Sequence, residues 1–102
     1  MSVTIDDKKL YGSMGELENS VLILFWVGDK PKLGSLSVTL PDNTSSQLLG
    51  DRDMILSKII GDRIASLFGK IVLVSTNLPI DFDYTEVLKL LNNMLSVKNE
   101  KS

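Results

Sequence analysis

Acidic side chains occur in three close groups, and they are the residues with the clearest capacity for chemistry. The groups are Asp6/Asp7, Asp51/Asp53, and Asp81/Asp83 with Glu86. Neighbouring carboxylates can divide general acid and base roles between them, or bind Ca²⁺ where enough oxygens converge. Each group, however, lies in a predicted turn or helix start, where carboxylates accept hydrogen bonds from free backbone N–H groups. We therefore predict that these acids cap helices and turns.

The side chains that normally assist such acids are missing. The chain has no histidine and no cysteine. Without histidine it lacks the side chain whose unperturbed pKa lies nearest neutrality, and without cysteine it lacks a thiolate nucleophile and a sulfur ligand for metals. We therefore expect no enzymatic activity, no catalytic residue, no metal site and no cofactor.

Two segments that combine glycine and lysine invite comparison with nucleotide-binding loops. The spacing of Gly61 and Gly69 is wrong for a phosphate-binding loop, and Ile71 stands where a hydroxyl residue would hold Mg²⁺. Residues 28–34 lack the dinucleotide-binding fingerprint. We interpret Gly61 as a helix residue packed closely on the sheet, and Gly69 as the residue that ends this helix.

Composition and charge narrow the class of partner. The 102 residues are 43 % hydrophobic and carry 11 basic and 13 acidic side chains, for a net charge of −2. This near-balance argues against nucleic acid, whose binding depends on neutralising phosphates. The longest apolar run, residues 21–27, is too short to cross a bilayer, and no secretory signal is visible. A domain of this size has little room for a deep pocket. We expect a cytosolic or nuclear protein with no nucleic acid, membrane or small-molecule substrate among its partners.

Hydrophobic periodicity predicts four strands in the first half of the chain. Residues 3–5 and 10–17 are short, weakly patterned strands, and residues 36–40 alternate cleanly between apolar and polar side chains. The polar segment 41–46 is predicted to be a loop. A strand covered on both faces belongs in the middle of its sheet. Residues 21–27 form such a strand, in which Val21, Ile23, Phe25 and Val27 alternate with Leu22, Leu24 and Trp26.

The second half of the chain predicts a helix, a strand and a helix. Asp51 or Asp53 caps a first helix that ends near residue 68, and residues 71–75 form the strand. Asp83 and Glu86 form a capping box before the last helix. Residues 97–102 are a polar tail that frays. The predicted buried stripes are Ile55, Leu56, Ile59, Ile60, Ile64, Leu67 and Phe68 in the first helix, and Tyr84, Val87, Leu88, Leu91, Met94 and Leu95 in the second, with Leu90 outside the stripe.

This order of elements predicts an α+β fold with a mainly antiparallel sheet and two principal helices, ordered ββββαβα, in a single domain over residues 1–102. The strands that are apolar on both faces leave two arrangements open. In one, a helix lies on each face of the sheet. In the other, one face, including Leu22, Leu24 and Trp26, stays uncovered and is buried by formation of a dimer.

Three segments, in order along the chain, carry a resemblance to a known family. They are Leu24-Phe25-Trp26-Val27-Gly28 with Pro31, Leu33, Leu36 and Val38 after it; Leu48-Leu49-Gly50-Asp51; and Val74-Ser75-Thr76-Asn77-Leu78. Together they resemble the eukaryotic proteasome assembly chaperone 4 family over residues 21–78, and the last helix fits as well. The segment before Glu16 and the loop 41–46 are shorter than that family leads us to expect.

The resemblance implies a non-enzymatic chaperone of the 20S proteasome. Family members pair with proteasome assembly chaperone 3 as a heterodimer, bind α-type subunits, particularly the fifth, promote formation of the α-ring, and leave as β-type subunits arrive. The expected fold is therefore dimer-forming. We assign Leu22, Leu24, Trp26 and Gly28 to packing of the fold or the dimer. We assign Leu49, Gly50 and Asp51 to the geometry of the loop before the first helix, with Asp51 as its cap, in preference to direct contact with a partner. The residues that contact the α-type subunit are not located by the sequence.

Other functions are compatible with the same residues. A self-associating scaffold or adaptor domain outside the proteasome pathway explains the fold and the missing chemistry, but not the ordered segments that resemble the family. A small-molecule carrier, or a weak hydrolase that uses aspartate and lysine, is a third hypothesis.

Overall fold

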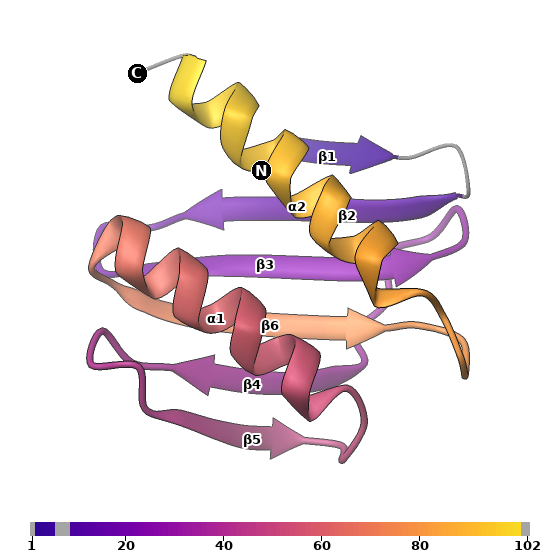
Figure 1. Cartoon of the computed structure of the whole chain (residues 1–102), viewed down its shortest axis with the longest axis horizontal. Helices are drawn as coiled ribbons and strands as arrows, with labels where there is room; N and C mark the ends of the chain where they lie inside the picture. The colour runs from indigo at the N-terminus through magenta and orange to yellow at the C-terminus, as the bar shows by residue number, and fades with distance from the viewer. Residues whose placement is uncertain (1, 6–8, 101–102) are drawn as a thin grey trace.

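The computed structural model describes the backbone of residues 2–5 and 9–100 and the side chains of residues 9–96. Asp6 and Asp7, and the side chains of the first predicted strand, lie outside these ranges. Six strands and two helices follow one another along this described part of the chain (Figure 1). They are β1 (Ser2–Ile5), β2 (Leu10–Glu16), β3 (Ser20–Val27), β4 (Ser35–Thr39), β5 (Ser45–Leu49), α1 (Met54–Phe68), β6 (Ile71–Asn77) and α2 (Tyr84–Glu100).

All six strands form one sheet in the order β1-β2-β3-β6-β4-β5. β3 and β6 run parallel, and every other neighbouring pair is antiparallel. This arrangement confirms the predicted α+β class with its mainly antiparallel sheet. It also confirms the central place of β3, which lies between β2 and β6 because both of its faces are apolar.

The prediction of a loop over residues 41–46 is wrong at its end, since β5 begins at Ser45. The turn itself is shorter and is closed by a hydrogen bond from the Leu40 N–H to the Thr44 carbonyl at 2.8 Å. The Thr39 and Ser45 hydroxyls then meet at 2.9 Å across the β4–β5 pair. The polar composition of this segment hides the strand, because an edge strand is held by backbone pairing and needs few apolar side chains.

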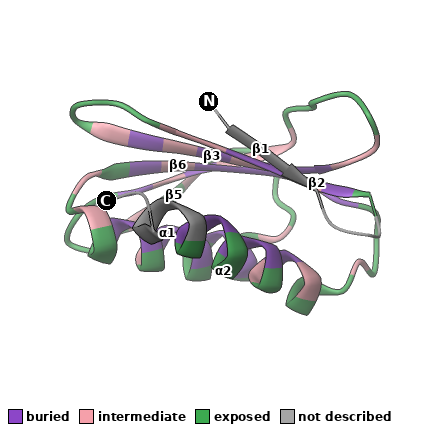
Figure 2. Cartoon of the chain, turned by 90° about the horizontal axis from the view of Figure 1, so that it is seen from above, coloured by how far each residue is buried: buried purple, intermediate pink, exposed green. Residues whose placement is uncertain are grey.

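Both helices lie on the same side of the sheet, and no described helix covers the other side (Figure 2). α1 crosses β4 and β6, and α2 lies over β1 and β2 (Figure 1). The arrangement with a helix on each face is therefore excluded. The core lies between the sheet and the two helices, and its largest fully buried apolar side chains are Phe25, Leu10, Ile23, Leu56, Ile60, Ile64, Leu91, Val21, Val72, Val74 and Val87.

Helix α1 ends where it is predicted to end, at Phe68, with Gly69 as its C-cap. Gly61 lies against β4, because a Cβ at this position would come within 2.1 Å of the Thr39 hydroxyl. The predicted apolar stripe, however, is too broad. Its buried part is Leu56, Ile60 and Ile64, whereas Ile55, Ile59 and Leu67 are exposed.

Helix α2 begins at Tyr84, and Asp83 accepts hydrogen bonds from the Thr85 backbone N–H and hydroxyl at 3.0 and 2.6 Å. Two residues differ from the predicted stripe, since Leu90 is buried and Tyr84 is exposed. Leu90 is buried because Gly12 of β2 leaves it space; a Cβ on Gly12 would lie 3.2 Å from Leu90 Cδ2. The helical backbone continues through Glu100, into the segment predicted as a polar tail.

Candidate interaction surface

The face of the sheet that carries no helix is built from alternate residues of its strands. In β3, Val21, Ile23 and Phe25 point into the core, so Leu22, Leu24 and Trp26 point the other way. Residues directly opposite one another on neighbouring strands share a face. The register therefore adds apolar neighbours from the adjoining strands, and we call the resulting set the open face: Tyr11, Leu22, Leu24, Trp26, Leu36, Val38, Leu49, Ile71 and Leu73.

Leu22 and Leu24 lie near the centre of the open face. Leu22 is opposite Leu73 of β6, and Val38 of β4 is opposite Leu73 in turn. All three strands contribute half-buried aliphatic side chains at this level. A continuous apolar area of this kind is uncommon on the surface of a monomer and typically marks a contact with another molecule.

Trp26 is packed within the fold of the single chain. Its ring stacks on Tyr11 with ring centroids 5.5 Å apart and an interplanar angle of 4°. It lies between Tyr11 and Asn77 in the register, and only 2 % of its surface is exposed. Trp26 therefore supports the open face from within, and the more accessible Leu22 and Leu24 present it to the exterior.

The loop after β3 crosses the end of β6 on the side of the open face. Gly28 ends β3 with a φ of 112°, a conformation that glycine adopts without strain. Two side chains of β6 then hold the far end of the loop. The Ser75 hydroxyl accepts from the Gly34 N–H at 3.1 Å, and the Asn77 amide donates to the Leu33 carbonyl at 3.2 Å.

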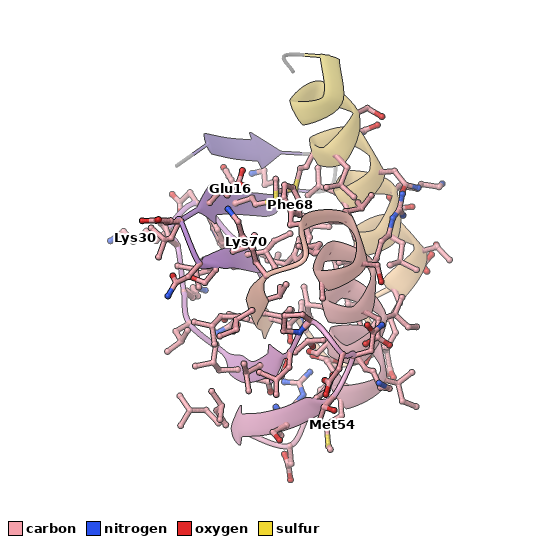
Figure 3. The ribbon with its side chains drawn as sticks, turned by 90° about the vertical axis from the view of Figure 1, so that its left-hand side faces the viewer. Glu16, Lys30, Met54, Phe68 and Lys70 are labelled. Carbon is pink, nitrogen blue, oxygen red and sulfur yellow. The ribbon has the colours of Figure 1, made fainter. Side chains whose placement is uncertain are left out.

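Charged side chains lie at the rim of the sheet (Figure 3). Lys30, in the loop after β3, is on the side away from the helices. At the other end of the sheet, Lys70 and Glu16 point toward one another and form an ion pair at 2.8 Å, and Lys70 also donates to the Leu17 carbonyl at 2.8 Å. Glu16 is opposite Val21, whose side chain points into the core, so Glu16 is on the helix side of the sheet. Of these charged residues, Lys30 is the one on the side of the open face.

The segment from Leu49 to Asp51 connects the edge strand to α1. Leu49 is opposite Leu36 and extends the open face to the sheet edge. Gly50 turns the chain with a φ of 73°. The prediction that Asp51 caps α1 is wrong, because the helix begins at Met54 and the N-cap position belongs to Asp53. Asp51 is exposed three residues before the helix.

Asp53 is at the N-cap of α1, yet its side chain makes no capping hydrogen bond. Its carboxylate instead accepts hydrogen bonds from the Tyr84 hydroxyl and, at 3.5 Å, from the Thr76 hydroxyl. The hydrogen bond to Asp53, together with desolvation, raises the pKa of Tyr84 above its ordinary value. Arg52 adds a hydrogen bond to the Leu78 carbonyl at 2.9 Å. These contacts join the starts of both helices to the end of β6.

The predicted pairs of acids do not come together as a chemical site. Among the side chains that the structure describes, no group of three or more acidic residues is placed to hold a metal ion. Asp83 is engaged at the start of α2, and Asp53 faces a phenol. The pairing of Asp53 with Tyr84 was not predicted, since nothing in the sequence links two residues 31 positions apart. Neither described helix is long and apolar enough to cross a membrane.

Comparisons with known proteins give no assignment: no protein-family model matches the chain, and no curated protein matches it.

Proposed function

We propose that this chain is a non-enzymatic chaperone of 20S proteasome assembly. It pairs with a protein like proteasome assembly chaperone 3; the pair binds α-type subunits, particularly the fifth, promotes formation of the α-ring, and is then released. The observation that carries the proposal is the open face, an apolar sheet surface that no described helix covers. The partner's identity rests on the segments within residues 21–78 that resemble the chaperone family, and the proposal places the protein in the cytosol or the nucleus.

The dimensions of the open face suit a stable protein partner. The molecule measures 32 × 30 × 21 Å, and the sheet extends along the two longer dimensions (Figure 1). A standard protein interface buries roughly 800 Å² on each side, which a face of this extent can supply. Packing the sheet of a related partner on it gives the two-layer arrangement of a sandwich, with side chains interdigitating about 10 Å apart.

The experiment is co-expression of the chain with an assembly-chaperone-3-like partner, followed by measurement of the mass of the complex and by addition of the purified fifth α-type subunit. We expect a one-to-one heterodimer that retains the α-type subunit. Leu24→Asp should abolish the heterodimer, because it buries an unpaired carboxylate in the interface. Leu17→Asp is the matched control: Leu17 is 61 % exposed in the turn after β2, so this variant should pair normally.

Two results would overturn the proposal. One is a chain that stays a stable monomer and does not bind the partner. The other is a homodimer of the chain that excludes the partner, which would instead support a self-associating scaffold. Circular dichroism of Leu24→Asp checks that the variant is folded; where it is not, Leu73→Ser probes the same face with a milder change.

A further inference from the structure

A row of large side chains on the outer surface of α1 is unusual for a helix that packs on one face only. Ile55, Ile59 and Leu67 are 76, 46 and 58 % exposed. Together with Arg63 they follow one another at intervals of four residues, and we call these four residues the α1 row. Single exposed aliphatic residues are ordinary on a protein surface. Three in one row that begins on the side opposite the core form a second apolar strip along the helix.

The α1 row leads into a groove between the two helices. The groove has a volume of about 550 Å³ and is lined by Arg63, Ser66, Leu67, Asn92, Leu95 and Ser96. A step of four residues advances about 40° around a helix, so the row begins on the outer surface at Ile55 and turns toward α2 at Leu67. Arg63 and Leu67 belong both to the row and to the groove, which makes the two a single surface.

Arg63 gives this surface a positive charge without a matching negative one. Among the described residues that line the groove, Arg63 alone is charged, and its guanidinium donates to the neutral amide oxygen of Asn92. The adjacent Asp62 is engaged by Lys58 at 3.3 Å. Among the described side chains, Arg63 has no carboxylate partner. A guanidinium held in this way has donors left to bind a carboxylate in the bidentate geometry that arginine favours.

We propose that the α1 row and the helix groove bind the client α-type subunit, through an amphipathic helix that places aliphatic side chains on Ile55, Ile59 and Leu67 and a carboxylate on Arg63. The inference rests on the proposed function. From Ile55 to Leu67 the row rises by twelve residue steps, about 18 Å, which matches about three turns of a partner helix. Small interfaces with an apolar strip and one charged contact are typical of reversible binding.

The position of this surface allows both partners to bind at once. The helices and the open face are on opposite sides of the sheet (Figure 2). A heterodimer formed through the open face therefore leaves the α1 row free. The client can then be held and released while the heterodimer stays intact.

The test uses the preformed heterodimer and the purified fifth α-type subunit, with affinity measured by titration. Arg63→Glu should weaken client binding by about tenfold or more, since it removes one charge-assisted contact and adds repulsion. Lys9→Glu is the matched control, with the same change of charge outside this surface. Lys9 is exposed before β2 and belongs neither to the α1 row nor to the lining of the groove, so its variant should bind within about threefold of the wild type. Ile55→Ser should also weaken binding, and this variant should fold because the Ile55 side chain is exposed.

The outcomes separate this inference from the proposed function. A wild-type chain that binds neither the chaperone partner nor the α-type subunit overturns the proposed function. A wild-type chain that binds both, while Arg63→Glu and Ile55→Ser bind the subunit equally well, overturns the client site alone. Loss of the heterodimer in Arg63→Glu would assign the groove to the other interface and also overturn the client site. Should Arg63→Glu fail to fold, Arg63→Gln gives the same comparison without the reversed charge.

Discussion

At the scale of single residues, tertiary contacts can change the role that the sequence predicts for a side chain. Asp53 occupies the N-cap position of α1, but its carboxylate binds the Tyr84 hydroxyl. This hydrogen bond is the main cause of the raised pKa of Tyr84, because it stabilises the protonated phenol beside a negative charge. The folded protein therefore holds this proton more tightly than the unfolded chain does. In alkaline solution the Tyr84 hydroxyl thus loses its proton more readily in the unfolded state, and the stability of the fold depends on pH.

We predict an alkaline loss of stability that depends on Tyr84. The stabilisation is fully present below the unfolded pKa of about 10 and is lost as the pH rises through the higher folded pKa. Urea unfolding near neutral pH and above about pH 10 should show a smaller decrease for Tyr84→Phe than for the wild type. The chain has two tyrosines, so in Tyr11→Phe the absorbance of the phenolate reports Tyr84 alone. Titration of Tyr84 at or below about 10 would contradict this explanation.

The helices show which contacts decide how an element packs. α1 approaches β4 closely at Gly61, where Thr39 occupies the space that a Cβ would need. α2 approaches β2 at Gly12, where Leu90 and Met94 fill the equivalent space. Each helix thus packs on the sheet at a glycine, which has no side chain. The distance between helix and sheet depends on that glycine.

Gly61→Ala should destabilise the protein, although alanine is the better helix former. The intrinsic gain of up to about 1 kcal/mol is outweighed by overpacking against Thr39, so we expect a net loss of about 1–2 kcal/mol in the free energy of unfolding. Denaturant unfolding measures it. Thr39→Ala removes the hydroxyl that meets the new Cβ, and the cost of Gly61→Ala should be smaller in that background. A stabilised single variant would show that α1 can move away from the sheet freely.

The sequence predicts most elements because their periodicity is local, and it misses what depends on their partners. The C-terminal end of α1 is predicted by the glycine that follows it, and the central place of β3 is predicted because the strand is apolar on both faces. β5 is missed because its pairing with β4 compensates for its polar composition. The breadth of the α1 stripe is overestimated, since the pattern shows which residues are apolar but not how many of them the sheet can cover. The burial of Leu90 is underestimated because the space that it fills is left by Gly12, which is far away in the sequence.

At the scale of the whole molecule, two surfaces of different character lie on opposite sides of one sheet. The open face is predicted in part. Leu22, Leu24 and Trp26 share one face of β3 as predicted, but the sequence could not show on which side of the sheet both helices would lie. It also could not separate Trp26, which is buried in the single chain, from its accessible neighbours. The three aliphatic residues of the α1 row belong to a predicted core stripe, and the structure shows that the sheet leaves them uncovered.

The two surfaces should respond differently to salt. The open face is apolar, so raising the ionic strength from low to about 0.5 M should change the affinity for the chaperone partner little. The client contact depends on Arg63, and its affinity should fall over the same range because screening weakens an exposed charge pair. Titrations of each partner at several salt concentrations provide the comparison. A client affinity that is independent of salt, in both the wild type and Arg63→Glu, would argue against a charged contact.

The parallel pairing of β3 with β6 has a consequence for folding of the chain while it is synthesised on the ribosome. Val21 is opposite Val72, so the middle of the sheet is closed by a contact between residues about 50 positions apart. Closing so long a loop is entropically costly, and pairing of this kind is slow to form. While the nascent chain grows, β1, β2 and β3 can pair with one another, but β3 keeps a free apolar edge until residues 71–77 have been synthesised. The most hydrophobic strand of the molecule therefore lacks its second neighbour until about 50 further residues have been synthesised, which makes the unfinished chain itself prone to association.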